Sequence, residues 1–398
     1  MSELNPLKIL FVDDEPLILD GLRRQFRSKR KVWEVRVAGS ADEALALMEQ
    51  DPASVVVSDM QMPQISGAAL LTTVRLRWPH AVRIILSGQT DQAEMLKDIG
   101  VIHQFLQKPC PPETIALAVE RTTRMSAAVR SGDLDQLVGG LESLPVVSGT
   151  YRELIGLLED EDSDVKAIGA VVEKDIGLST KLLQMVNSAF FGLPRTIRSA
   201  QQAILLIGLQ NLKQMALTSQ IFDAVTQDQD CDRFVAGLWR VSSDISSMAA
   251  GLARANGQPA QVQDTARLAG TLSLIGRAVL ARNAPERFAR AQKHAASEGV
   301  SLREAEIQEF KLAHEAVGAY ALGLWAFDHG VVDAVALQAS PDRAGDVGAA
   351  CPLPYLHVAR GHVARAGIVE PLAVDRDWVE SVGIDTAAAT SIQASEAA

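Results

Sequence analysis

The chain has 398 residues, 47% hydrophobic and 22% charged, which is enough for two or three domains that each bury a core. A net charge of −11 argues against an output that covers DNA with positive charge, and no apolar run approaches the roughly 20 residues that span a bilayer. The first residues show no signal-peptide layout and the three cysteines are widely spaced, so we expect a cytoplasmic protein with reduced thiols.

Strand and helix patterns alternate over the first third of the chain. A helix opens at Pro16, another follows Ser40, and a third is expected from Gly67 to Trp78. The expected strands are Leu7 to Val12, Trp33 to Ala38, Val55 to Asp59, Arg83 to Ser87 and Gln104 to Pro109. Five strands that alternate with helices predict an α/β fold with a doubly wound, five-stranded parallel sheet.

Polar side chains stand where these predicted strands end. Asp13 and Asp14 close the first strand, Asp59 the third, Ser87 the fourth and Lys108 the fifth. Because the carboxyl ends of parallel strands share one edge, we expect these side chains to converge. Three carboxylates invite Mg²⁺, and a lysine and a hydroxyl suit an incoming phosphoryl group. Taken alone, the stretch around Asp59 also fits a helix cap or a turn.

Residues 7 to about 124 resemble a two-component response-regulator receiver domain, which has a flavodoxin-like fold. The acidic pair, the SDMQMP turn, the Ser of ILSG and the Lys of LQKP carry the resemblance. It implies a bacterial phosphorelay in which Asp59 accepts phosphate from a sensor histidine kinase or a phosphotransfer protein. It also implies that Asp14 and Asp59 ligate Mg²⁺, with Asp13 acting through water and Gln61 through its backbone carbonyl.

The same resemblance assigns a switch. Lys108 would pair with the phosphoryl oxygens, Ser87 would donate its hydroxyl to them, and Phe105 would rotate into the space that the Ser87 loop vacates. A degenerate receiver that keeps this pocket without being phosphorylated is the alternative interpretation.

A helix is expected from Glu113 to about Val129, and the break at 130–133 follows it. This helix either continues toward the second domain, where it could transmit motion or form a dimer seam, or ends as an ordinary final receiver helix. Beyond it helical patterns dominate, which predicts an all-α domain.

Several segments of this second region resemble the HDOD family, the noncatalytic relatives of HD phosphohydrolases. The most specific is the run NSAFFG at 187–192. Other matching segments are Leu144-Pro145, Glu173-Lys174-Asp175, Leu182-Leu183, Ile197 to Gly208, Trp239, Ala269-Gly270, His314 to Gly318 and Trp325. The resemblance implies an HD-like helical fold.

The metal ligands of the HD hydrolases are missing at matching positions. Val241 stands where a histidine often follows Trp-Arg, Ser273-Leu274 replaces the His-Asp doublet, and Gln338-Ala339 replaces a paired histidine. Only His314 remains, and one imidazole does not make a catalytic metal site. We therefore interpret His314 as a helix-packing residue and the output as noncatalytic.

These patterns divide the chain into a receiver at 1–124, a helical linker at 125–139, an HDOD output at 140–340, and a closing helix with a frayed tail at 341–398. The closing helix is expected at Leu353 to Ala366, and fraying from about Thr386.

The sequence as a whole predicts a response regulator whose HDOD domain binds a downstream signalling protein, with no nucleic acid or membrane partner and with a homodimer left open. One competing hypothesis is an HD-type cyclic-dinucleotide phosphodiesterase or a nucleotide-binding output. DNA-binding regulation is another, although no helix-turn-helix with a basic recognition helix stands out.

Overall fold

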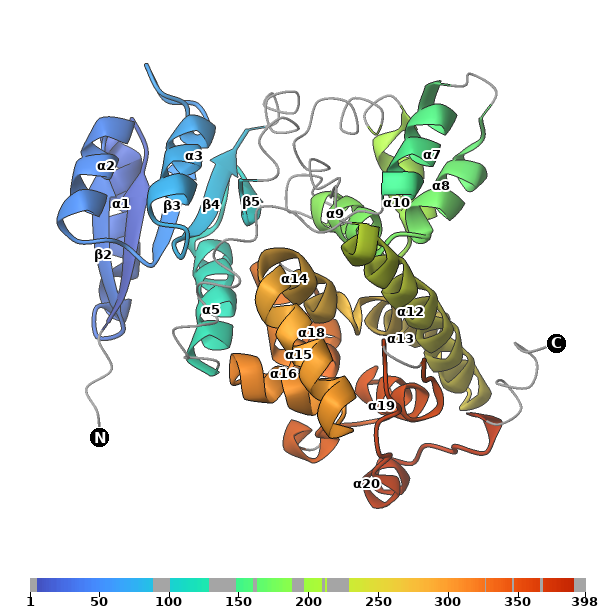
Figure 1. Ribbon diagram of the computed structural model, residues 1–398. Helices are drawn as coiled ribbons and strands as arrows, with labels where there is room; N and C mark the ends of the chain where they lie inside the picture. The colour runs from blue at the N-terminus through green and yellow to red at the C-terminus, as the bar shows by residue number, and fades with distance from the viewer. Residues whose placement is uncertain are drawn as a thin grey trace.

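The structure is a computed structural model, shown in Figure 1. It describes residues 6–88, 101–128, 148–159, 163–187, 197–209, 212, 229–325, 327–345, 347–365 and 368–389. An α/β layer forms the N-terminal part and helices form the remainder (Figure 1). Within these ranges no helix is both long and apolar enough to cross a membrane. Most of the run at 187–192 that carries the HDOD resemblance lies outside the described residues.

Five parallel strands form one sheet in the order β2-β1-β3-β4-β5, which confirms the predicted doubly wound sheet. The strands are β1 Leu7–Val12, β2 Trp33–Ala38, β3 Val55–Asp59, β4 Val82–Ser87 and β5 Gln104–Gln107. The helices of this layer are α1 Pro16–Gln25, α2 Ala41–Gln50, α3 Gly67–Arg77 and α5 Pro112–Ala128. Every residue of β3 is buried, because neighbouring strands flank it and helices cover the sheet; this accounts for its run of valines.

Local chemistry sets the ends of these helices. The Ser40 hydroxyl accepts a hydrogen bond from the backbone N–H of Glu43, and the Ser66 hydroxyl caps α3 in the same way. The α-helix that begins at Pro16 ends at Gln25, and Phe26–Lys29 continue as a 3₁₀ turn. Phe26 is nevertheless buried, because its ring stacks on Phe11 with the centroids 5.5 Å apart.

The remaining described residues form a helical domain, as expected. Its longest helix, α12, packs along α13 and also contacts α19. In chain order the helices are α7 Ser148–Glu159, α8 Val165–Glu173, α9 Ile176–Val186, α10 Ala200–Ile207, α12 Gln229–Ala255, α13 Ala260–Leu272, α14 Ile275–Asn283, α15 Pro285–Glu298, α16 Leu302–Phe310, α17 His314–Leu324, α18 His329–Leu337, α19 Leu353–His362 and α20 Arg376–Ser381. Aliphatic side chains dominate the core that they enclose.

The closing helix is shorter than the sequence predicts. We expected it to reach Ala366, but α19 ends at His362 and Val363 is extended. The backbone carbonyl of Arg360 accepts a hydrogen bond from the N–H of Leu372, so the returning chain takes the place of another helical turn.

The C-terminal segment also departs from the expectation. The short helix α20 was not predicted; the Asp375 carboxylate caps it by accepting a hydrogen bond from the N–H of Trp378. The predicted fraying from Thr386 is wrong for residues 386–389, because Ala389 is fully buried and its N–H donates to the Thr386 carbonyl. Residues 390–398 lie outside the described part of the chain.

Candidate functional site

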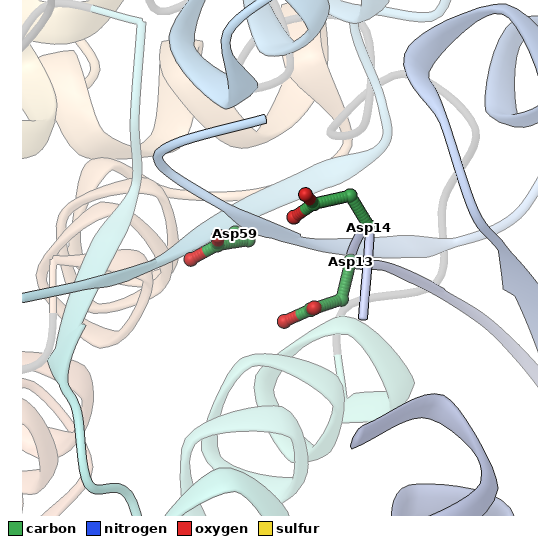
Figure 2. A group of neighbouring side chains, drawn as sticks. All are labelled: Asp13, Asp14 and Asp59. Carbon is green, nitrogen blue, oxygen red and sulfur yellow. The ribbon is translucent and has the colours of Figure 1, made fainter. Parts of the chain in front are cut away.

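Three aspartates meet at the carboxyl edge of the sheet. Asp13 and Asp14 follow the last residue of β1, and Asp59 is the last residue of β3. Because β1 and β3 are paired in register, with Val12 opposite Ser58, these strand ends lie side by side. Figure 2 shows the three carboxylates projecting into the same space.

The geometry of this cluster suits a hard divalent cation. One carboxylate oxygen from each of Asp13, Asp14 and Asp59 lies within 4.8 Å of the others. Asp13 and Asp59 are buried, with 2% and 8% of their surface exposed, whereas Asp14 faces solvent. Mg²⁺ binds carboxylate oxygens and usually keeps several water ligands, so a cluster that is open to solvent on one side suits it. The residues present therefore fit a magnesium ion.

Lys108, just beyond β5, joins two of the carboxylates. Its Nζ lies 2.6 Å from Oδ1 of Asp59 and 3.1 Å from Oδ2 of Asp13. Burial raises the pKa of Asp59, and the hydrogen bond from Lys108 opposes that rise. Burial alone would lower the pKa of Lys108, but its contacts with Asp59 and Asp13 raise it. The ammonium therefore stays charged beside the cluster.

The backbone around Asp59 is held on both sides. The Ser58 hydroxyl donates to the Asp59 carbonyl at 2.9 Å, and the N–H of Gly67 donates to the Met60 carbonyl at 2.9 Å. Just after β1, the N–H of Glu15 donates to Oδ1 of Asp13 at 2.9 Å. Sequence reasoning missed these supporting residues.

The structure also describes the positions of the other three residues that the sequence singles out, Ser87, Phe105 and Gln61. Ser87 is buried at the end of β4, and its carbonyl accepts a hydrogen bond from the N–H of Lys108 at 2.8 Å. Phe105 is 5% exposed and pairs in register with Ile85 of β4. Gln61, two residues after Asp59, is exposed.

The sheet layer contacts the helical domain directly. Helix α5 packs against α17, and the Gln184 amide of α9 lies 3.4 Å from the backbone oxygen of His103, just before β5. Lys181 of α9 is buried in the same region, where desolvation and the nearby charge of Arg83 lower its pKa to about 8. The backbone N and Nη2 of Arg83 lie 3.0 and 2.9 Å from the two ring nitrogens of His103.

The positions that hold metal in HD hydrolases are filled with packed and hydrogen-bonded groups here. Val241 is buried, and the Gln338 amide donates to the Ser273 carbonyl at 3.0 Å. The guanidinium of Arg360 in turn donates to Oε1 of Gln338 at 3.0 Å. In the described part of the chain, the aspartate cluster is the one group of three or more His, Cys, Asp and Glu side chains close enough to hold an ion.

His314 is a buried packing residue, as its place in the sequence indicates. Its Nδ1 lies 2.7 Å from Glu306, whose other oxygen accepts from Arg277 at 2.7 Å. Burial would raise the pKa of Glu306, but His314 and Arg277 bring it down to about 2. The Nε2 atom of His314 has no hydrogen-bond partner among the described residues.

Two family models match the chain. The response regulator receiver domain matches residues 9–120, and the HDOD domain matches residues 144–341. The fold and the matches define the protein as a response regulator of two-component signalling. More particularly, the chain belongs to the response regulators that join a receiver to an HDOD domain.

Curated relatives and solved structures resemble parts of the chain. The hydrogenase transcriptional regulatory protein HoxA of Cupriavidus necator is 37% identical over 131 residues, which are 32% of this chain and 26% of that protein. An uncharacterized protein of Treponema pallidum is 24% identical over 56% of this chain and 41% of its own length. The crystal structure of the MmoQ response regulator from Methylococcus capsulatus is 24% identical, with a TM-score of 0.48, over 63% of this chain and 98% of that one. The chain thus spans about a quarter of HoxA.

Proposed function

We propose that Asp59 is the phosphoacceptor of this regulator and that a sensor histidine kinase or a phosphotransfer protein is the donor. The observation that carries the proposal is the Lys108 ammonium, which bridges Asp59 and Asp13 beside the exposed Asp14. A fixed cation next to a carboxylate cluster is what a transferred phosphoryl group needs when it reaches a carboxylate nucleophile.

The transfer forms one bond and breaks one. A carboxylate oxygen of Asp59 attacks phosphorus, the P–N bond to the donor imidazole breaks with its electron pair going to nitrogen, and an acyl phosphate results. Lys108 turns from the carboxylates to the new phosphoryl oxygens. Asp14, Asp59 and the backbone carbonyl of Gln61 would hold Mg²⁺, with Asp13 acting through water, and the ion would neutralise phosphoryl charge.

We also assign the switch to two buried residues. Ser87 donates its hydroxyl to the phosphoryl group, and Phe105 rotates as the Ser87 loop moves inward. Both residues are buried, Ser87 at the end of β4 and Phe105 within the adjacent strand β5, and His103, just before β5, contacts the output. A movement of this edge reaches α9 through that contact, and phosphorylation shifts the population of domain arrangements.

The HDOD domain then acts by binding a downstream signalling protein, without catalysis. The Ser273, Gln338 and Arg360 hydrogen bonds support this, because they tie together positions where a hydrolase would need free metal ligands. The receiver takes residues 1–124, the linker 125–139 and the output 140–340, and the segment 341–398 closes the output domain. The regulator works in the cytoplasm, and homodimer formation is one arrangement that phosphorylation can shift.

The first test is phosphate acceptance. Incubation with acetyl phosphate and Mg²⁺ should add one phosphoryl group by intact-mass spectrometry, and Asp59→Asn should abolish this addition. Asp42→Asn is the matched control, because Asp42 is an exposed carboxylate in the first turn of α2. Equal labelling of wild type and Asp59→Asn would refute the assignment.

The second test concerns the output. Light scattering and pull-down from lysate, with and without beryllofluoride and Mg²⁺, should show a change in assembly or in captured protein for wild type and none for Asp59→Asn. If wild type accepts phosphate but neither quantity changes, the phosphoacceptor assignment stands and the proposed coupling to the output fails.

A further inference from the structure

A cavity of about 140 Å³ lies in the helical domain, where α8, α9, α12 and α13 meet the chain that enters α10. At roughly 10–15 Å³ for each water position, it has room for on the order of ten waters. It is therefore a ligand-sized space rather than a packing defect. The lining is largely polar and includes Glu173, Arg198, Trp239, Ser243, Ser247 and Arg267.

The cavity is distinct from the sheet-edge site and from the positions of the lost hydrolase metals. On α12, Val241 points into the core, whereas Trp239, Ser243, Ser246 and Ser247 line the cavity. The spacing of these four residues, i, i+4, i+7 and i+8, puts them on one face of the helix. Neither Ser273 nor Gln338 is among the lining residues.

Two arginines bring positive charge to this space. Arg198 lies just before α10 and Arg267 is on α13. Neither guanidinium makes a hydrogen bond or an ion pair with any residue that the structure describes, and the Nε of Arg198 is buried without a partner. A buried donor without an acceptor is costly, so this group is poised for an acceptor that enters the cavity.

One carboxylate offsets part of this charge. Glu173 ends α8 and lines the cavity. Burial raises the pKa of its carboxyl group, whereas the backbone amides of Gln201 and Ala200 and the charge of Arg267 act in the opposite direction. Two guanidinium groups against one carboxylate leave a net positive charge, which favours an anion.

The other walls provide hydroxyls and one aromatic ring. Ser246 is engaged: it donates to the Arg267 carbonyl at 2.8 Å and lies 3.0 Å from the Thr271 hydroxyl. Ser243 and Ser247 make no hydrogen bond within the described ranges, and each is only partly buried. Partly exposed Trp239 completes this wall. The cavity thus combines two guanidinium groups with the hydroxyls of Ser243 and Ser247 and the ring of Trp239.

We propose that this cavity binds a sugar phosphate monoester, either free or as the ribose phosphate end of a mononucleotide. Arg198 and Arg267 pair with the phosphate, because planar guanidinium groups match its oxygens. The sugar hydroxyls exchange hydrogen bonds with Ser243 and Ser247. Trp239 contacts the sugar or, in a nucleotide, the base. The HDOD output would then read a metabolite in addition to the state of the receiver.

Isothermal titration of the full-length protein with ribose 5-phosphate, AMP and inorganic phosphate tests the proposal. We expect at least one of the two esters to bind, and Arg198→Gln and Arg267→Gln each to weaken it by about tenfold or more. Arg240→Gln is the charge-matched control: Arg240 is exposed on α12 beside Trp239 but does not line the cavity. It should bind as wild type does.

The arms of the experiment separate the two sources of the ester. Tighter binding of AMP than of ribose 5-phosphate, lost in Trp239→Leu, identifies a nucleotide, whereas equal binding identifies the sugar phosphate alone. The proposal is overturned if neither ester binds at about 10 mM, where a millimolar site is nearly filled. It is also overturned if inorganic phosphate binds as tightly as both esters, or if Arg240→Gln loses as much affinity as the cavity variants.

Discussion

The carbonyl oxygen of Asp59 occupies the space in which a side chain of Gly67 would begin. A Cβ on Gly67 would lie 1.8 Å from that oxygen and 2.9 Å from the Ser58 hydroxyl. The oxygen belongs to the backbone and cannot rotate away. Helix α3 therefore begins in direct contact with the residue that we assign as phosphoacceptor, and only glycine permits this approach.

Gly67→Ala is expected to destabilise the protein by about 1–3 kcal/mol, because α3 or the end of β3 must shift. The same shift moves the Asp59 carboxylate, so phosphate acceptance should also slow. Urea unfolding and acetyl phosphate labelling measure the two effects.

Gly21→Ala is the matched control, since Gly21 lies within α1 and a Cβ there meets nothing within 4 Å. It should stabilise the protein by about 0.5–1 kcal/mol through helix propensity. If the two variants behave alike, the contact between Gly67 and Asp59 does not restrain the site.

Lys108→Met should separate metal binding from phosphate acceptance. Removing an ammonium that lies 2.6 Å from Asp59 leaves the carboxylate cluster more negative, so Mg²⁺ affinity should rise by about tenfold. Phosphorylation should nonetheless fall, because the phosphoryl oxygens lose their cation. Calorimetric titration with Mg²⁺ and the labelling assay measure these opposite changes. Lys8→Met, whose Lys8 pairs with Asp51, should change neither; a fall in Mg²⁺ affinity in Lys108→Met would contradict the argument.

The convergence of the three aspartates and Lys108 was predictable because each of them stands where a strand pattern ends. The runs that lead to Asp59 and Ser87 are strands buried on both faces, and parallel strands bring their ends to one edge whatever the loops do. The approach of Gly67 was missed, although a glycine at the first position of a helix was a signal for it.

The helical domain was less predictable. Helical periodicity indicates which face of a helix is buried, but it does not indicate which other helix packs against that face. Arg198 and Arg267 are far apart in the sequence, and nothing local indicates that they line one cavity. Lys181 stands in an apolar pattern that predicts burial, but its proximity to Arg83 and His103 depends on how the receiver docks. The end of α19 was misplaced because the returning chain at Leu372 satisfies the Arg360 carbonyl.

The buried ion pair between Arg277 and Glu306 should be costly to break. Both side chains are fully buried with Nε and Oε1 2.7 Å apart, so Glu306→Gln should destabilise the protein by about 3–5 kcal/mol in urea unfolding. Glu309→Gln is the control, because its partner Arg290 is largely exposed and solvent screens such a pair, so this variant should lose much less stability. If both variants lost a similar free energy of unfolding, burial would not determine how much these ion pairs contribute to stability.

Stability should fall in mild acid because of His103. Burial, Arg83 and Lys181 hold its pKa well below 6.5, so the folded state keeps the ring neutral while the unfolded chain takes up a proton. Stability is therefore full above about pH 6.5 and decreases below it, by at most about 1.4 kcal/mol per pH unit. Urea unfolding across this range measures the slope.

His103→Gln should flatten that pH dependence, since the uncharged amide does not titrate. His294→Gln should leave it unchanged, because His294 is partly exposed on α15. An unaltered slope in His103→Gln would assign the acid sensitivity to other groups.

Helix α5 belongs to the receiver by sequence, yet it packs against α17 of the output. Cutting the chain between the receiver and the helical domain would expose the surfaces through which these two parts contact each other. Lys181 and the surroundings of His103 belong to these surfaces. Experiments on either half alone would thus study a fragment that has lost the contacts between the sheet layer and the helical domain. The intact chain is the smallest unit in which the response of this regulator can be measured.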